Sequence, residues 1–145
     1  MSQFHAGPAQ QSLPVLSDIP IEVLICYESA YGNGVRQHLQ NGQLITVLSD
    51  DGWFGRSLGL YQHAQLSQIR ALETGRYVIN STNNGITEII DTQGKVIKRL
   101  APFKAGVLSG TVQRFTGDTP WVWWGIWPTV FLVLVLLGIA RYKRK

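Results

Sequence analysis

The segment from Trp121 to Ala140 contains no charged residue, and it constrains the fold more than any other part of the chain. Twenty apolar residues are about the length that an α-helix needs to cross a bilayer. Four tryptophans lie at its beginning, and a basic tail from Arg141 to Lys145 follows its end. Aromatic belts and basic flanks are typical of the two ends of a membrane helix. We therefore predict a transmembrane helix that begins near Trp127 or Pro128, rather than a buried core helix.

The basic tail also predicts an orientation. Basic flanks of membrane helices stay in the cytoplasm, so we expect a cytoplasmic C-terminus and an extracytoplasmic soluble part, which is periplasmic if the membrane is the inner membrane of a Gram-negative bacterium. The first residues, Met1 to Pro8, have neither the basic nor the apolar region of a signal peptide. We interpret the chain as the back end of a longer membrane protein, whose upstream helices would set the topology.

Composition excludes several classes of function. The net charge is +4, and much of it lies in the tail, so no basic surface suggests nucleic-acid binding. The chain has one cysteine and three widely separated histidines, which share no metal-ligand spacing. No glycine-rich nucleotide motif is present. We predict no metal and no cofactor.

The chain divides into an irregular segment, 1–20, a domain, 21–120, and the tryptophan-rich flank, helix and tail, 121–145. Within the domain, short apolar runs alternate with helical patterns. We predict strands over 22–27, 44–48 and 77–81, helices over 33–40 and 60–74, a hairpin of 86–90 with 96–99, and a last strand over 107–112. Leu66, Ile69 and Leu72 are expected on the buried side of the second helix. This order predicts an α/β sheet with helices on at least one face.

Cys26 is the only cysteine, and it directly follows the apolar run 21–25. A strand that ends in a nucleophile can present it at a turn, where the next backbone N–H groups face a developing oxyanion. An inert cysteine packed in a core would give the same local pattern. The residues alone leave both interpretations open.

Several short motifs nevertheless occur in one order. They are 25–28 around Cys26, the loop 51–55, the helix with Gln62-His63 and 70–73, the turn 81–86, and 125–128 before the terminal helix. From about Ile21 onward they resemble the C-terminal portion of the apolipoprotein N-acyltransferases, a membrane-embedded branch of the nitrilase superfamily. The resemblance implies part of a nitrilase-like αββα sandwich carried on membrane helices.

The resemblance also implies an activity. Enzymes of that family move an acyl chain from a phospholipid, through a cysteine thioester, to the N-terminal amine of a diacylglyceryl-cysteine lipoprotein. Cys26 would be the nucleophile, the backbone N–H of Tyr27 an oxyanion donor, and Glu28 a supporting acid. Trp53 and Phe54 would contact the acyl chain or the substrate. A buried carboxylate paired with an arginine is an equal alternative for Glu28, and core packing is the alternative for the two aromatic residues.

Some family features are missing. Nitrilase-type sites need a general-base Glu and a Lys before the Cys, but residues 1–25 contain no Lys and only Glu22, inside the nucleophile's own strand. Asp50 stands where the family usually has an amide. We interpret His63 as structural, since the family uses no histidine base. We expect the chain alone to be inactive, with the missing half supplied upstream or by another chain. A membrane-anchored nitrilase-type amidase and a non-catalytic remnant that needs a partner are the alternatives.

Overall fold

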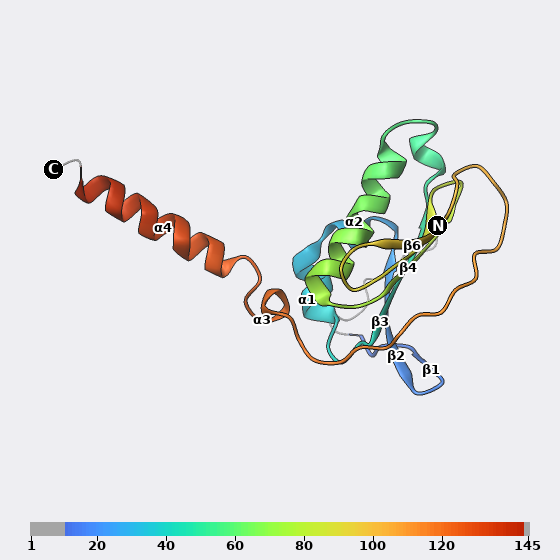
Figure 1. Ribbon diagram of the computed structural model, residues 1–145, viewed down its shortest axis with the longest axis horizontal. Coiled ribbons are helices and arrows are strands. Elements are labelled where there is room, and N and C mark those ends of the chain that lie inside the picture. The colour runs from blue at the N-terminus through green and yellow to red at the C-terminus, as the bar shows by residue number, and fades with distance from the viewer. Residues whose placement is uncertain (1–10, 144–145) are drawn as a thin grey trace, which may run out of the picture.

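The computed structural model describes residues 11–143, in which a six-stranded sheet carries two helices and an arm of two more helices follows (Figure 1). The elements in chain order are β1 (Val15–Leu16), β2 (Ile19–Ile25), η1 (Cys26–Ala30), α1 (Gly32–His38), β3 (Leu44–Asp50), η2 (Gly52–Phe54), α2 (Gly59–Thr74), β4 (Val78–Asn83), β5 (Thr87–Ile90), β6 (Val96–Leu100), α3 (Pro120–Trp124) and α4 (Trp127–Tyr142). The η elements are 3₁₀ helices. The predicted α/β class is confirmed, and so is a strand–helix alternation within a few residues of the predicted bounds.

The strands lie side by side in the order of the sequence, β1 to β6. β2, β3 and β4 are parallel, and their connections contain α1 and α2. β5 and β6 add to β4 as an antiparallel hairpin, and β1 pairs antiparallel with β2 at the other edge. Parallel strands need such crossover connections, so the helices that link them also cover the sheet.

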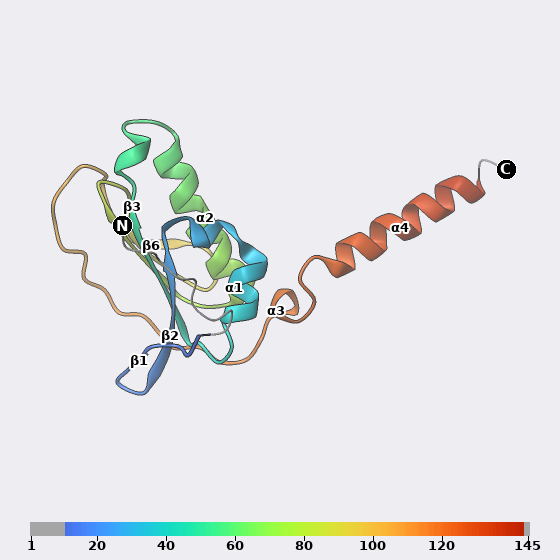
Figure 2. The ribbon, with the colours of Figure 1, turned by 180° about the vertical axis from the view of Figure 1, so that it is seen from behind.

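α1 and α2 lie against the same face of the sheet in both views of the molecule (Figures 1 and 2). The core lies between this helical layer and the sheet. It consists of apolar side chains from both layers, namely Leu24, Val35, Leu39, Ile45, Val47, Ala71, Val78 and Ile90. One helical layer and one sheet make up half of an αββα sandwich, which agrees with the expectation of a partial nitrilase-like domain.

The buried face of α2 differs from the predicted one. Ile69 and Leu72 are exposed, Leu72 to 61%. The buried face instead contains Leu60, His63, Ala64, Ser67, Arg70, Ala71 and Thr74. The prediction failed because the side of the helix that faces the sheet is partly polar, so its hydrophobicity does not reveal its burial.

The predicted strand over 107–112 is wrong, because these residues have no strand partner and Val107 is exposed. They belong to an extended segment, 101–119, that runs along the side of the sheet away from α1 and α2 (Figures 1 and 2). Single contacts hold the segment: the ammonium of Lys98 donates to the carbonyl of Ser109 at 2.8 Å, and the ring of Phe115 stacks on Tyr77.

The arm consists of two separate helices, because Gly125 between α3 and α4 has a φ of 56°. α4 has 16 residues, a length of about 24 Å against a hydrocarbon core of about 30 Å. Within residues 11–143, no helix is long and apolar enough to span a membrane. The structure therefore does not support the predicted transmembrane helix, nor the orientation derived from it.

Candidate active site

The three parallel strands end at one edge of the sheet, and the candidate residues follow directly after them. In the register, Ile25 of β2 lies opposite Leu48 of β3, and Asp50 of β3 lies opposite Asn83 of β4. The carboxyl ends of parallel strands are where α/β sheets bind their ligands. The elements after Ile25, Asp50 and Asn83 therefore meet where a site is expected.

Cys26 begins η1 directly after β2, in a backbone conformation that cysteine rarely adopts. Its φ is 52°, in the left-handed region, which costs an L-residue roughly 1–2 kcal/mol. Such strain persists where the surroundings enforce it, and it is typical of functional positions. The side chain is partly buried rather than enclosed in the core. The sharp turn predicted after the strand is present.

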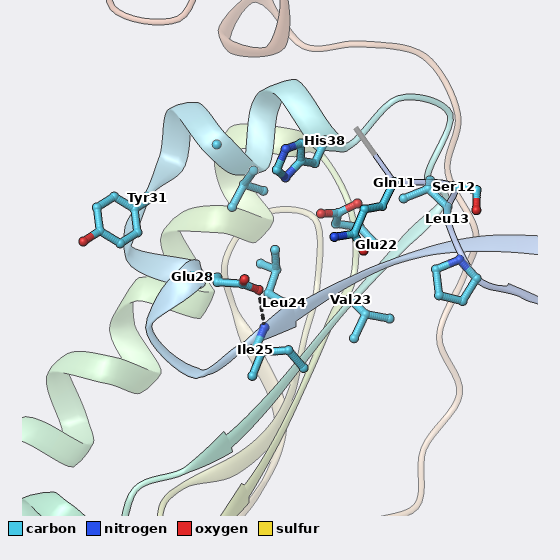
Figure 3. A pocket seen from close by; sticks show the side chains of 13 residues that line it. Gln11, Ser12, Leu13, Glu22, Val23, Leu24, Ile25, Glu28, Tyr31 and His38 are labelled. Atoms are coloured by element: carbon cyan, nitrogen blue, oxygen red, sulfur yellow. Dashed lines mark hydrogen bonds between the residues drawn. The ribbon is translucent and has the colours of Figure 1, made fainter. Parts of the chain in front are cut away.

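Glu28 supports this turn through the backbone. Its Oε2 accepts a hydrogen bond from the N–H of Ile25 at 2.7 Å, one residue before the cysteine (Figure 3). The side chain is exposed, and its hydrogen-bond partner among the described residues is this N–H rather than an arginine. The alternative of a buried carboxylate paired with an arginine is therefore wrong.

His63 lies directly behind the turn. This residue of α2 is 4% exposed, and its Nδ1 is 2.7 Å from Oδ1 of Asp51. Its Nε2 is 3.2 Å from the carbonyl oxygen of Cys26 and 3.3 Å from Oγ of Ser29. The ring thus connects α2, the end of β3 and η1. Both ring nitrogens contact groups other than the thiol of Cys26.

Asp51 is almost fully buried, and its Oδ1 also accepts a hydrogen bond from the hydroxyl of Ser49 at 2.6 Å. Burial alone would raise the pKa of Asp51, but the hydrogen bonds from His63 and Ser49 and the charge of His63 lower it overall. The hydrogen bond to Asp51 raises the pKa of His63, although burial of the ring acts in the opposite direction. Opposite shifts of this kind are those of an ion pair.

The two loop aromatics are placed differently. Trp53 is 87% exposed, so core packing is wrong for this residue. Phe54 is partly buried, its ring centre lies 6.0 Å from that of His63, and it lies so close to Gly59 that a Cβ there would overlap it. Phe54 therefore connects the loop to the ring of His63, which lies behind Cys26, while the side chain of Trp53 projects away from the loop.

Asp50 and Tyr27 have local partners. Oδ1 of Asp50 accepts the N–H of Gly52 at 2.9 Å, so its charge stabilises the turn of its own loop. The exposed ring of Tyr27 makes an edge contact with Tyr31. The role of the Tyr27 N–H as an oxyanion donor stays a prediction.

A cavity of about 400 Å³ adjoins the turn on the side of α1. Figure 3 shows that residues of β2, η1 and α1 line it, among them Glu22, Glu28 and His38. Burial raises the pKa of Glu22 to about 7, and the nearby His38 opposes this rise. The cavity therefore contains a carboxyl group that titrates near neutral pH.

Asp51 and Ser29 were not among the predicted site residues. Asp51 is 12 residues from His63 in the sequence, and the two meet only because the end of β3 lies beside the first half of α2. Asp51 does belong to one of the motifs that carry the family resemblance, and this was the only signal for it.

Comparison with protein families matches residues 4–119 to the carbon-nitrogen hydrolase family. Among individual proteins, the chain is similar to an apolipoprotein N-acyltransferase of Azotobacter vinelandii, with 41% identity over 145 residues, which is 100% of this chain and 28% of the relative. A Coxiella burnetii protein of the same name is 41% identical over 137 residues, 94% of this chain and 28% of the relative. The chain thus spans about 28% of the length of these relatives.

Among solved structures, the chain is similar to a carbon-nitrogen hydrolase from Helicobacter pylori. The TM-score is 0.59 and the sequence identity 11%, with 68% of this chain and 42% of the other covered. At this identity the likeness concerns the fold alone. It agrees with the half-sandwich described above, and the resemblance predicted from the motifs is confirmed.

Proposed function

The chain belongs to the carbon-nitrogen hydrolase family, and from this premise we propose that it is part of an apolipoprotein N-acyltransferase in which Cys26 carries the acyl chain. The position of Cys26 is the observation that carries the proposal. It follows a parallel strand at the carboxyl edge of the sheet, with the positive φ of a residue held in a sharp turn.

The reaction has two steps, and the thiol is regenerated. The Cys26 thiolate attacks an ester carbonyl of a phospholipid, the C–O bond breaks, and the alcohol of the lysophospholipid leaves with a proton. The N-terminal amine of a diacylglyceryl-cysteine lipoprotein then attacks the thioester, the C–S bond breaks, and the amide forms. A thiolate suits both steps, because it is a strong nucleophile and a good leaving group.

The other site residues would support these steps. Glu28 fixes the backbone next to Cys26 through its bond to Ile25, and the N–H of Tyr27 would donate to the oxyanion of each tetrahedral intermediate. Trp53, exposed on its loop, would cover the acyl chain, with Phe54 as the fixed base of that loop. The base Glu and the Lys of nitrilase-type sites would come from the part of the enzyme outside this chain.

An amidase is the alternative within the same family. The likeness to solved hydrolases and amidases is a likeness of fold, at 11–21% identity, and it does not favour hydrolysis over acyl transfer. The two relatives described above, each 41% identical to this chain over the matched residues, are named as N-acyltransferases, which favours acyl transfer.

A chimera tests the proposal. This chain would replace the matching segment of the Azotobacter vinelandii relative, and the chimera would be expressed in cells depleted of their own enzyme. We expect mass spectrometry to find an acyl adduct on Cys26 and N-acylated lipoproteins. Both should disappear in Cys26→Ala.

The Ser67→Ala variant is a matched control, because Ser67 is buried on α2 and its hydroxyl has no partner within the described residues. This variant should keep both signals. Lipoproteins matured equally well by Cys26→Ala would show that Cys26 is not the nucleophile. Release of free fatty acid or ammonia without an acylated amine would favour the amidase.

A further inference from the structure

The contacts of His63 determine its protonation state. Nδ1 lies 2.7 Å from Oδ1 of Asp51, an ionised carboxylate that can only accept, so Nδ1 carries a hydrogen. Nε2 lies 3.2 Å from the carbonyl oxygen of Cys26, which also can only accept. A neutral ring with its hydrogen on Nδ1 would direct the lone pair of Nε2 at that carbonyl.

Ser29 strengthens this argument. Its single hydroxyl hydrogen is donated to the carbonyl of Cys26 at 3.2 Å. The contact between Ser29 Oγ and Nε2, at 3.3 Å, is therefore a hydrogen bond only if Nε2 donates. With Ser29 donating to Cys26, hydrogens on both ring nitrogens satisfy the acceptors on both sides of the ring, Asp51 at Nδ1 and Cys26 and Ser29 at Nε2. The ring that satisfies all these contacts is the imidazolium.

The partners of the ring come from every element around it. Asp51 follows β3, Cys26 and Ser29 belong to η1, and the ring of Phe54 in η2 lies at a tilt beside it. Among the described groups, the one full charge that acts on the ring is that of Asp51. The ring is therefore a buried cation with a single counterion, aimed at the backbone of the cysteine.

We propose that Asp51 and His63 form a positioning pair, in which the imidazolium donates from Nε2 to the carbonyl of Cys26 and holds this residue in its left-handed conformation. The proposal rests on the assignment of Cys26 as the nucleophile. Charge-assisted hydrogen bonds are about twice as strong as neutral ones, so one such bond can offset the strain at Cys26. His63 acts through the backbone and takes no proton from the thiol.

The ring itself gives the first test. In the purified chain, labelled with ¹⁵N-histidine, the signals of His63 can be assigned by their loss in His63→Gln. We expect both ring nitrogens of His63 to be protonated at pH 6.5, the ordinary pKa of an imidazole. A neutral ring with one tautomer at pH 6 would overturn the proposal.

The backbone of Cys26 gives the second test. The ¹³Cα and ¹³Cβ shifts of Cys26 report whether the residue is in the left-handed region. Asp51→Asn keeps the shape of the side chain but removes the counterion, so the ring loses its charge and the bond from Nε2 to the carbonyl of Cys26 is no longer charge-assisted. We expect Cys26 to leave the left-handed region in Asp51→Asn, and to stay in it in Ser67→Ala. Unchanged shifts in a folded Asp51→Asn would overturn the proposal.

Kinetics separate this proposal from the function itself. In the chimera, Asp51→Asn and His63→Gln should slow formation of the acyl-enzyme by roughly 100-fold with KM unchanged, the cost of a nucleophile misplaced by about 1 Å. Full acylation rates in both variants would reject the pair and leave the function intact. An inactive chimera with a protonated His63 ring and a left-handed Cys26 would reject the function and leave the pair.

Discussion

Glu22 is a carboxyl group in an unfavourable place, since it lies in the middle of β2 and is 4% exposed. Burial raises its pKa from 4.5 to about 7, while the charge of His38 lowers it and that of Glu28 raises it further. Between these two pKa values the folded chain holds a proton that the unfolded chain has released. The contribution of Glu22 to stability therefore falls as the pH rises from 4.5 to 7.

Replacing Glu22 by glutamine removes this titration. We expect the Glu22→Gln variant to gain stability relative to the native chain on going from pH 5 to pH 8, by on the order of 3 kcal/mol, because a shift of one pKa unit corresponds to about 1.4 kcal/mol. Urea unfolding of both chains at the two pH values measures the difference. The other acids with shifted pKa values, Asp51, Glu73 and Glu88, contribute equally to both chains and cancel. A constant difference between the chains would mean that Glu22 titrates normally.

At this scale the sequence indicates the candidate nucleophile better than it indicates the residues around it. Cys26 is predictable because it is unique and directly follows an apolar run, which are local properties. The pairing of Asp51 with His63 depends on β3 and α2 meeting in space, and no periodicity encodes it. The hydrogen bond from the N–H of Ile25 to Glu28 is local, yet the sequence is equally compatible with an arginine partner. The bond forms only when the backbone turns after Ile25, and the sequence does not show the shape of that turn.

The turn between β4 and β5 packs closely against Asp51, at the end of the neighbouring strand β3, and Gly85 makes this close approach possible. A Cβ at this position would lie 2.2 Å from Oδ2 of Asp51. Asp51 cannot move away easily, because Ser49 and His63 hold its other oxygen. The turn therefore needs glycine at position 85, because any side chain there would collide with Asp51.

We expect Gly85→Ala to destabilise the chain by about 1–3 kcal/mol, the cost of overpacking a buried site. Gly34→Ala is the matched control, because Gly34 lies in α1 and its new Cβ would only touch Tyr31, at an ordinary 3.7 Å. That variant should gain about 0.5–1 kcal/mol, since alanine favours helices over glycine. Thermal unfolding compares the two. Equal changes in stability in the two variants would show that the Asp51 side chain moves aside to accommodate the new methyl group.

The two aromatic residues of η2 are expected to differ in their effect on stability. Trp53 is largely exposed and contributes little to the core. Trp53→Ala should therefore leave the melting temperature of the chain unchanged and lower acyl transfer by the chimera only in part, since an aromatic cover positions the substrate but makes no bond. Phe54→Ala, which removes the contact with His63, should lower both. Undiminished transfer by Trp53→Ala would mean that this side chain does not contact the acyl chain.

The alternation of strands and helices could be predicted. In residues 21–100, the short apolar runs typical of strands and the spacing of apolar residues typical of helices occur in separate segments. The buried face of α2 could not, since Arg70 and Thr74 face inward: Arg70 forms an ion pair with Glu73, and the Thr74 hydroxyl donates to the carbonyl of Arg70. The segment 107–112 has strand-like composition, but a strand exists only where a neighbour accepts its hydrogen bonds. The first error arises because local polar contacts satisfy an inward-facing arginine and threonine, and the second because pairing with a strand distant in sequence decides whether a strand forms.

For the whole molecule, α3 and α4 differ in how they join the domain. Val122 of α3 packs against the core, and the guanidinium of Arg36 donates to the carbonyl of Val122 at 3.0 Å. Thr119, which caps α3, bonds to the carbonyl of Glu73. α4 has no buried residue and extends away from the domain (Figure 1).

Two shortened chains should therefore behave differently. A chain that ends at Gly125 should melt within about 2 °C of the full chain, because it loses no buried contact of the domain. A chain that ends at Asp118 also loses α3, and should melt several degrees lower, since about 1 kcal/mol corresponds to some 4–8 °C in a domain of this size. Scanning calorimetry makes the comparison. Equal melting temperatures of the two shortened chains would mean that α3 adds nothing to the domain.

The positive φ of Gly125 has a mechanical consequence. The residue is a pivot between a helix fixed to the domain and a rigid rod about 24 Å long. Turning the rod by about 10° at the pivot displaces its tip by about 4 Å, and a glycine resists such a turn less than any other residue. The rod can therefore change its direction at Gly125 while α3 keeps its contacts with the domain, so the two helices of the arm are mechanically independent.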